Sequence, residues 1–394
     1  MTIDLARARA DTPACARLLH FNNAGASLMP APVLRAVKRH LDLEARIGGY
    51  EAADAAADRL EAVYDSVARL LNCAREEVAL VENATVAWQL AFHSLEFEPG
   101  DRILTAMAEY ASNYIAYIKL GRERGVAVEP VPNDPDGALD VAALERMIDG
   151  RTRLIAVTHL PTNGGLVNPA EAIGRVARAH GIPYLLDACQ SIGQMPVDVE
   201  AIGCDFLSAT GRKYLRGPRG TGFLYVRRAL LERTEPPFID LQGARWSAPD
   251  RYELRPDARR YENWESYVAG QLGLGVAVDY ALGWSLAAIA ARVGNLAETL
   301  RHGLAAIPGV AVRDLGRRRS GIVSFTVEGT AAGEILRRLR ADAINVASSS
   351  PSSTLLDAEA RGLPDLVRAS VHYYNSEAEV ARFLRAITTI AGRG

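Results

Sequence analysis

Leu154-Ile-Ala-Val-Thr158 and Tyr184-Leu-Leu186 are two short apolar runs, and residues 170–180 between them are spaced as an amphipathic helix. Two strands joined by a helix form a βαβ unit, whose strands lie parallel in one sheet. Short runs of the same kind recur before and after this unit, separated by helical stretches. The alternation predicts a large α/β domain built on a mostly parallel sheet.

The other elements expected in this domain lie on both sides of the βαβ unit. The flexible break Gly48-Gly49-Tyr50 separates two amphipathic helices, 31–47 and 51–71. A helix is expected to end near Ser94 and another to cover 113–123. Further strands are predicted at 78–81, 102–105, 206–208 and 222–226.

The last third of the chain has a different pattern. Residues 271–306 are rich in Ala and Leu, which predicts one extended helix or a kinked pair. The elements expected after it are a strand at 321–327, a helix at 332–340, a strand at 367–371 and a closing helix at 376–391. We therefore predict a large domain over residues 16–270 and a smaller α+β domain over 271–394, joined by residues 1–15.

Length, charge and cysteine usage limit the possible partners. A chain of 394 residues can bury the cores of two domains, and its net charge of −2 gives no electrostatic reason to expect nucleic acid or an anionic membrane as partner. The four cysteines, at 15, 73, 189 and 204, have neither metal-ligand spacing nor the pattern of a disulfide framework. The N-terminus lacks an apolar signal core. We expect a cytoplasmic protein without a metal site.

Asp187 and Lys213 carry the chemical signal of the sequence. Asp187 follows the second strand of the βαβ unit, at the edge where open α/β sheets bind ligands. Lys213 lies in the later run Ser208-Ala-Thr-Gly-Arg-Lys-Tyr-Leu-Arg-Gly-Pro-Arg-Gly-Thr-Gly222. Pyridoxal phosphate (PLP) needs a lysine that forms a Schiff base with its aldehyde and a carboxylate that keeps its pyridine nitrogen protonated. The pair therefore predicts a PLP enzyme.

These motifs resemble the class V aminotransferase family from about Phe21 to the C-terminus. That family has PLP fold type I, with helices on both faces of the large sheet. It includes cysteine desulfurases, selenocysteine lyases, isopenicillin N epimerase and hercynylcysteine sulfoxide lyase. The resemblance implies that Lys213 is the Schiff-base lysine, that Asp187 binds the pyridine nitrogen and that Gln190 hydrogen-bonds the phenolic oxygen.

The resemblance also implies a phosphate-binding cup. Asn83-Ala84-Thr85 lies between a strand and a helix, where backbone N–H groups can bind an anion, and Ala84 and Thr85 are the implied contacts. Thr210 stands where the family has a Ser or Thr that holds phosphate. Arg212 replaces a family histidine, and its planar guanidinium suits phosphate well.

Three further residues are expected around the cofactor ring. Tyr110 replaces the family histidine that stacks over the pyridine, and supplies an aromatic face with a weaker acid–base group, because its free pKa is about 10. His159 matches a family histidine, and Thr162 stands where desulfurases carry an Asn that contacts the ring. The residues that we expect to be catalytic are Lys213, Tyr110 and His159.

Two segments are expected to bind the substrate, an L-α-amino acid. Val367-Arg368-Ala-Ser370, followed by Asn375, is similar to the family segment whose arginine binds the α-carboxylate. Arg368 can do so with a pair of N–H groups. Asn22-Asn23-Ala24-Gly25 is similar to a segment that closes over the substrate, with Asn23 as the contact, although the same residues also suit a plain turn.

The most discriminating feature is a missing cysteine. Desulfurases carry a nucleophilic cysteine on a loop shortly before the late arginine, whereas residues 345–354 here read Asn-Val-Ala-Ser-Ser-Ser-Pro-Ser-Ser-Thr. Serine cannot store sulfur as a persulfide. The lysine loop is also one residue longer than the common desulfurase pattern and contains Arg216, which is similar to the epimerase and sulfoxide lyase branch. We expect a C–S β-lyase acting on a cysteine derivative, with an epimerase or an aminotransferase as alternatives.

Two points are left open by the sequence. The serine run 348–353 either binds a polar substrate tail or is only a flexible loop. The resemblance implies a homodimer with active sites at the interface, where the partner of a family member contributes a Thr from a Gly-Thr-Pro segment. Here the matching stretch is Tyr261-Glu-Asn-Trp-Glu-Ser266, so Asn263 or Ser266 is expected to take the place of that Thr.

Overall fold

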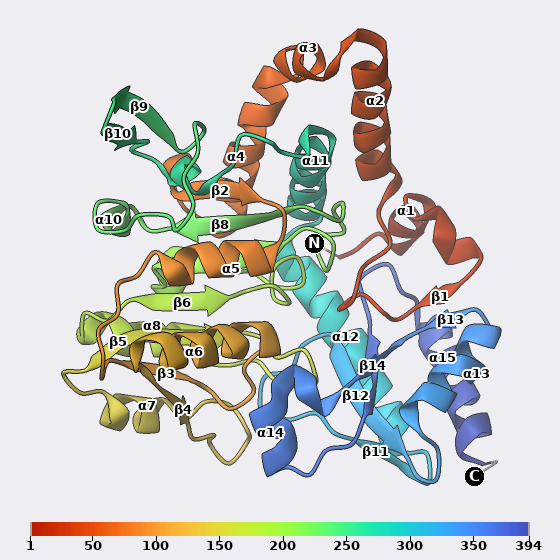
Figure 1. The fold of residues 1–394 in the computed structure, drawn as a ribbon. Helices are drawn as coiled ribbons and strands as arrows, with labels where there is room; N and C mark the ends of the chain where they lie inside the picture. Colours follow the sequence, from red (N-terminus) through yellow and green to blue (C-terminus); the bar gives the residue numbers. More distant parts are fainter. Residues whose placement is uncertain (1, 393–394) are drawn as a thin grey trace.

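The computed structural model describes residues 2–392 and is built around a seven-stranded sheet (Figure 1). The strand order is β2-β8-β7-β6-β5-β3-β4, and neighbours are parallel except in the two pairs that include β8. The strands are β2 (Val78–Val81), β3 (Arg102–Ala106), β4 (Ala127–Val131), β5 (Thr152–Thr158), β6 (Tyr184–Asp187), β7 (Phe206–Thr210) and β8 (Gly222–Val226). The predicted mostly parallel sheet is confirmed. The pattern missed β4 because this edge strand buries only its last residue.

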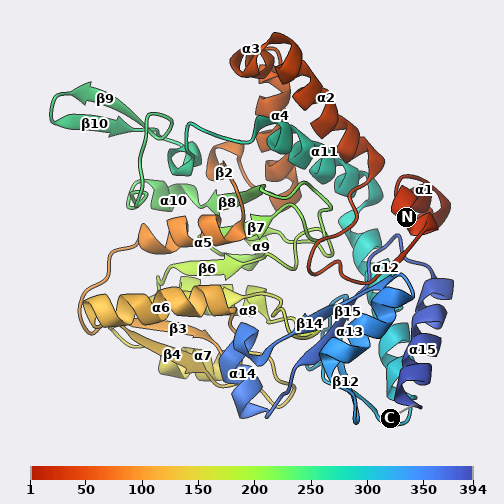
Figure 2. The same ribbon diagram turned by 45° about the vertical axis from the view of Figure 1, so that its right-hand side comes forward.

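Helices cover both faces of this sheet, and alternate side chains of the strands pack against them. In β5, Leu154 and Ala156 pack with α5 and α6, whereas Ile155 and Val157 pack with α7 and α8 on the other face. Figure 2 shows α5 and α6 side by side in front of the sheet, with α8 behind it. These helices are α5 (Ala84–His93), α6 (Ala111–Arg124), α7 (Val141–Met147) and α8 (Ala170–Ala179), with the short α9 (Val199–Ile202) and α10 (Arg228–Leu231) further along.

A smaller α+β region follows, as the pattern predicted. Its four antiparallel strands have the order β11-β12-β15-β14, and α12, α13 and α15 lie beside them (Figure 1). The elements are β11 (Val310–Val312), β12 (Ile322–Val327), α13 (Ala332–Ala341), β14 (Ala347–Ser349), α14 (Leu355–Ala360), β15 (Leu366–Ser370) and α15 (Glu377–Ala391). Ser376 caps α15, since its hydroxyl accepts from the Glu379 N–H at 3.2 Å.

The N-terminal helices differ in detail from the expectation. The break after α2 (Ala31–Ile47) is confined to Gly48, whose φ of 100° suits glycine. The predicted helix 51–71 is two helices, α3 (Gly49–Asp54) and α4 (Ala57–Leu71). After the short α1 (Leu5–Ala10), β1 (Leu19–His20) runs to the smaller region and pairs there with β13 (Ile344–Asn345).

The Ala- and Leu-rich segment forms a kinked pair, one of its two expected shapes. α11 (Val268–Trp284) and α12 (Leu286–Ala305) meet at Ser285 with a bend of 78°. No helix within residues 2–392 is by itself long and apolar enough to span a membrane, and this bent pair reaches that length only as a whole. The predicted domain boundary after residue 270 falls within α11, and the division of the chain there stays a prediction.

Candidate active site

A cavity of about 280 Å³ opens where strands of the large sheet end. Segments far apart in the sequence meet there, since β6 and β7 end at it and α5 begins at it. This is the edge at which open α/β sheets bind ligands. Seven of the predicted site residues line the cavity: Ala84, Thr85, Tyr110, Asp187, Thr210, Arg212 and Lys213.

The carboxylate of Asp187 is buried and held from two sides. The Asn113 side chain donates to Oδ2 at 3.0 Å, and the Cys189 N–H donates to Oδ1 at 2.9 Å. Burial raises the pKa of Asp187, while these hydrogen bonds and the charge of Lys213 oppose that rise. A cation beside this carboxylate would relieve the cost of its burial, so the site fits a protonated ring nitrogen.

Two residues to which the sequence analysis gave no role, Asn113 and Glu109, support Asp187. Glu109 accepts hydrogen bonds from the Asn113 side chain at 2.8 Å and from the Thr158 N–H at 2.9 Å, and burial raises its pKa. Glu109 thereby orients Asn113 toward Asp187. Glu109 also accepts from the Tyr110 N–H at 3.0 Å, which fixes the backbone of the residue predicted to stack on the ring.

One end of the cavity has the donors that a phosphate group needs. Asn83 caps α5, because its side chain accepts from the Val86 N–H at 3.0 Å, and the N–H groups of the first turn are free of helical partners. Thr210 contributes a hydroxyl and Arg212 a guanidinium, which also donates to the Gly25 carbonyl. A helix N-terminus, a hydroxyl and a guanidinium together fit the PLP phosphate.

Lys213 lies on the loop after β7 and forms no ion pair with any residue from 2 to 392. Arg216, further along this loop, has a φ of 61° and is almost fully buried. Its guanidinium donates to the Leu28 carbonyl and to the Tyr373 hydroxyl, both at 2.8 Å. Arg216 therefore ties the lysine loop to the N-terminal segment and to the smaller region.

Three other predicted cofactor and substrate residues, Arg368, Thr162 and Gln190, form a chain of hydrogen bonds and do not line this cavity. Arg368 donates to the Thr162 hydroxyl at 2.6 Å and to the Thr162 carbonyl at 3.1 Å, and Gln190 donates to the same hydroxyl at 3.4 Å. In the described part of the chain, Arg368 Nε and Gln190 Oε1 are buried without a hydrogen-bond partner. Since such atoms are costly to leave unpaired, they fit polar groups of a bound cofactor and substrate.

Asn23 has a different role from the predicted one. Its side chain donates to the carbonyls of Ser370, at 2.7 Å, and His20, at 3.3 Å, and accepts from the Tyr374 hydroxyl. The amide is fully buried and occupied by these contacts, so it does not present a group to the substrate. Asn23 instead joins the N-terminal segment to β15.

His159 does not lie with Lys213 either. Its backbone N–H donates to the Asp187 carbonyl at 2.9 Å, but the residue lines a second cavity, next to the start of α8. Burial and the nearby charge of Arg318 lower its pKa to about 3, which leaves the imidazole neutral. The structure therefore does not support the predicted catalytic role.

The serine segment is held in place by Asn163, the neighbour of Thr162 and the other candidate for the ring-contacting Asn of desulfurases. The Asn163 side chain donates to the Ser350 carbonyl and to the Thr354 hydroxyl, both at 3.0 Å, and accepts from the Ser349 hydroxyl at 2.7 Å. The Ser324 hydroxyl donates to the Asn163 carbonyl at 2.7 Å. These bonds hold residues 349–354 against the loop after β5.

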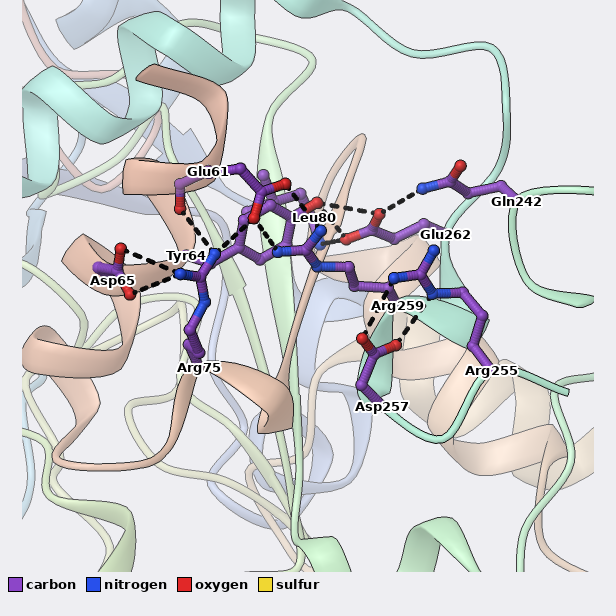
Figure 3. A network of polar contacts seen from close by, with 10 residues as sticks. All are labelled: Glu61, Tyr64, Asp65, Arg75, Leu80, Gln242, Arg255, Asp257, Arg259 and Glu262. Atoms are coloured by element: carbon purple, nitrogen blue, oxygen red, sulfur yellow. Dashed lines mark hydrogen bonds and ion pairs between the residues drawn. The ribbon is translucent and has the colours of Figure 1, made fainter. Parts of the chain in front are cut away.

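Figure 3 shows a polar network that anchors the segment predicted to reach a partner subunit, residues 261–266. Glu262 accepts hydrogen bonds from the Tyr64 hydroxyl and from the Leu80 N–H, both at 2.8 Å. Arg259 lies 3.7 Å from the Tyr64 ring centroid and pairs with Glu61 at 2.7 Å. The network fixes the backbone before Asn263 on the outside of β2.

The residues after Glu262 line a larger surface cavity of about 810 Å³. Asn263, Trp264 and Ser266 belong to it, and so does Tyr50 from the start of α3. Glu82 lines both this cavity and that of Lys213, so the two are adjacent. The predicted partner-facing residues therefore lie beside the candidate active site and are accessible from outside.

Comparisons with known proteins agree with this geometry. The family model described as Aminotransferase class-V matches residues 19–383. A probable cysteine desulfurase of Methanothermobacter thermautotrophicus is 30% identical, with 98% of each chain covered. The apo structure of a cysteine desulfurase from Thermococcus onnurineus NA1 superposes with a TM-score of 0.93 at 28% identity, covering 100% of this chain and 99% of that one.

A more distant structural neighbour shares the fold. The cystine C–S lyase C-DES, in complex with its product cysteine persulfide, has a TM-score of 0.86 at 23% identity, with 96% of this chain and 99% of that chain covered. The family match spans nearly the whole chain, and the lysine, the carboxylate and the groups predicted to bind phosphate meet in one cavity. This chain belongs to the class V aminotransferase family of PLP enzymes, as its motifs predicted.

Proposed function

We propose that this enzyme is a PLP-dependent C–S lyase that breaks the bond between the β-carbon and the sulfur of a cysteine derivative. Cysteine desulfurases among its relatives and a cystine C–S lyase among its structural neighbours support chemistry at such a bond. The observation that carries the choice of lyase is the serine segment. No cysteine follows Cys204 in the sequence, and Asn163 holds residues 349–354 in place.

The residues around the cavity divide the work of holding the cofactor. Ala84, Thr85, Thr210 and Arg212 would hold the phosphate group, and Asp187 the protonated pyridine nitrogen. When bound, PLP supplies an electron sink that stabilises the carbanion formed at the substrate α-carbon. Asn113 and Glu109 keep the Asp187 carboxylate oriented through two buried hydrogen bonds.

On the substrate side, Arg368 would bind the α-carboxylate of the amino acid. Its Nη1 donates to Thr162, and its buried Nε has no partner among residues 2–392, so a free donor remains for the substrate. Lys213 would take the proton from the α-carbon, as a free amine does when it acts as a general base. Cleavage of the bond between the β-carbon and sulfur would release the sulfur group with both bonding electrons, and it would take up a proton. The aminoacrylate left behind would react with water to give pyruvate and ammonia.

Cys189 is the only cysteine that lines the cavity of Lys213 in the described chain, and it does not suit a sulfur-accepting role. Burial raises the pKa of its thiol, so it stays protonated and is a poor nucleophile. The four cysteines are all free thiols, which supports our proposal that the protein works in a reducing, cytoplasmic compartment.

Product analysis tests the proposal. Purified holoenzyme is incubated with a panel of cysteine derivatives, and the released molecules are identified by mass spectrometry. We expect pyruvate and ammonia together with sulfide, sulfenate or a small thiol, in equal amounts. Alanine, or a persulfide on the protein, would return the enzyme to the desulfurases. A substrate that only changes handedness would indicate an epimerase, and a keto acid that keeps its sulfur an aminotransferase.

We also propose that the enzyme is a homodimer. Large apolar side chains are exposed near the cavity of residues 263–266, including Tyr50, Trp264 and Tyr267. Exposed apolar clusters of this kind mark interaction surfaces. Because this cavity adjoins that of Lys213 through Glu82, a partner covering it would bring its own residues next to Ala84 and Thr85. Sedimentation at micromolar concentration tests this, and an active monomer would contradict it.

A further inference from the structure

The cavity of Lys213 has a third cation, Arg219, that the proposed reaction leaves without a role. Arg219 lines this cavity together with Lys213 and Arg212. Its side chain is exposed, and among residues 2–392 it forms no ion pair. The guanidinium group of Arg219 is therefore free to bind an anionic group.

The turn that carries Arg219 lies between two elements that are expected to bind phosphate. Two residues after Arg219, the Thr221 carbonyl accepts from the Thr210 hydroxyl at 3.3 Å. Gly222, the next residue, begins β8 and packs closely on Asn83, the N-cap of α5, since a Cβ at Gly222 would lie 2.9 Å from the Asn83 Cα. Arg219 is therefore held near both the end of β7 and the start of α5.

The charge of a phosphate group calls for more than one cation at this end of the cavity. A phosphate monoester carries a charge of about −2 near neutral pH. Arg212 supplies one positive charge, and one of its N–H groups already donates to the Gly25 carbonyl. Glu82, an exposed residue in the wall of the same cavity, adds a negative charge next to Asn83. A second guanidinium would offset both the remaining phosphate charge and that of Glu82.

The segment that is expected to supply a donor from the partner subunit offers only neutral groups. Its candidates are the Asn263 amide and the Ser266 hydroxyl, where the family resemblance implies a Thr. Both residues line the outer cavity of about 810 Å³, and neither lines that of Lys213. Arg219 lines the cavity of Lys213 in the same chain and brings a positive charge. Charge-assisted hydrogen bonds to phosphate are about twice as strong as neutral ones.

We propose that Arg219 binds the cofactor phosphate from within the same subunit and takes the place of a donor from the partner. The phosphate would then be held by the first turn of α5, the Thr210 hydroxyl and two guanidinium groups, those of Arg212 and Arg219. Arg219 has no part in bond breaking and acts by holding the cofactor. The inference rests on PLP as the cofactor and not on the choice of a lyase reaction.

Titration of the apoprotein with PLP and with pyridoxal, which lacks the phosphate, tests this role. Bound cofactor is measured by its visible absorbance on Lys213. Arg219→Ala should weaken PLP binding about tenfold, because a charge-assisted hydrogen bond is lost, and should leave pyridoxal binding unchanged. Arg219→Lys keeps the charge and should recover part of the affinity. Arg385→Ala, at an exposed arginine of α15 outside the cavity, is the matched control and should change neither affinity.

Two further variants distinguish Arg219 from a donor of the partner subunit. Asn263→Ala and Ser266→Ala should each lower PLP affinity less than Arg219→Ala does. Unchanged PLP binding in Arg219→Ala would overturn the proposal, and so would a larger loss in either of the other two variants. Equal losses of PLP and pyridoxal binding would overturn it as well, because Arg219 would then support the fold and not the phosphate. All of these affinities are measured without turnover, so they hold whichever product the enzyme forms.

Discussion

Compared with the residues around Asp187, those around Arg368 leave more polar atoms without a partner. Both oxygens of Asp187 accept hydrogen bonds, from Asn113 and from the backbone of Cys189, and Glu109 orients Asn113 in turn. Arg368 is bound at Nη1 only, and its Nε is buried without a partner in the part of the chain described. The proposed cofactor end, around Asp187, is therefore held in place by the protein, whereas the proposed substrate end, around Arg368, has polar atoms left over for a ligand.

The difference follows from where the two groups lie in the fold. Asp187 ends a central strand, and its partner Asn113 comes from α6, a helix of the same large domain. Arg368 lies on β15 of the smaller sheet, and Thr162 on the loop after β5, so two separate parts of the fold must meet to form that end. Residues that bind a cofactor can serve many different reactions, whereas the residues that bind the substrate select one of them.

The largest effect is expected at Lys213, which belongs to both ends. Lys213→Ala should lower turnover about a thousandfold or more, because it removes the general base as well as the amine that binds the cofactor. The variant should also lose the visible absorbance of lysine-bound cofactor. Steady-state kinetics and absorbance spectra measure the two effects. Lys119→Ala, on an exposed lysine that pairs with Glu123, is the matched control and should leave both unchanged.

At the cofactor end, Asp187→Asn should lower kcat about a hundredfold, since an amide cannot balance the charge of a protonated ring nitrogen.

The same variant should also change how the stability of the apoprotein depends on pH. Burial raises the pKa of Asp187 above its unfolded value, so its contribution to stability is present at low pH and is lost as the pH rises through the folded pKa. Asn does not ionise and avoids this loss.

Thermal unfolding of the two apoproteins at about pH 5 and about pH 8 measures the difference. The gain in Tm of Asp187→Asn over the unmodified protein should be larger at the higher pH. Asp279→Asn, at an exposed ion pair with Arg69, serves as the control and should show no such trend. A gain that shrinks with rising pH would contradict burial as the dominant influence on Asp187.

Arg368→Lys tests the substrate end, and its main effect should be on KM. Lysine keeps the charge but loses the forked pair of donors, which costs about 1.5 kcal/mol, or roughly tenfold in KM. Cofactor binding should not change, because Arg368 is absent from the wall of the Lys213 cavity. Arg382→Lys on the surface of α15 is the control. Weaker cofactor binding with unchanged KM would reverse our assignment of the two ends.

A smaller effect is expected from Asn163→Ala, which releases the serine segment from the loop after β5. Three side-chain hydrogen bonds are lost, and stability should fall by about 1–3 kcal/mol. KM should rise a few-fold if residues 349–354 form a fixed wall of the substrate site. Asn295→Ala, on the exposed side of α12, is the control for stability. An unchanged KM would show that this segment is not part of the substrate site.

The sequence predicted the cofactor end better than the substrate end for the same structural reason. Lys213, Asp187, Thr210 and Ala84 follow strand ends or a helix start, and parallel strands bring such positions together without further information. The role of Asn113 was missed because its partner Asp187 lies 74 residues further along the chain. Only packing of α6 on the sheet brings the two side chains together.

Asn23 and His159 are two predicted site residues whose side chains have other contacts than expected. Asn23 and Asn22 are adjacent, and backbone direction decides which of them is saturated by Ser370 and Tyr374. His159 directly follows β5, where successive side chains point to opposite sides of the sheet. A motif match fixes the position of a residue along the chain to within one or two places, but not the cavity that its side chain lines.

The smallest effect is expected from removing cysteines. This change tests whether a thiol of the enzyme accepts the sulfur of the substrate. Burial raises the pKa of Cys15 to about 11 and that of Cys73 to about 12, and it also raises those of Cys189 and Cys204. All four therefore stay protonated near neutral pH, where only a thiolate would accept sulfur efficiently. None lies in the serine segment.

A variant with Cys15 and Cys73 changed to Ser and Cys204 changed to Ala should keep its kcat within a few-fold. Alanine is chosen for Cys204 because this side chain is fully buried, and a hydroxyl there would cost stability. Cys189→Ala, made separately, should also stay active, since the backbone N–H and not the thiol donates to Asp187. Release of pyruvate and of the sulfur product is measured in both. If either variant loses activity while its cofactor spectrum and Tm stay normal, sulfur passes through an enzyme thiol and the lyase assignment fails.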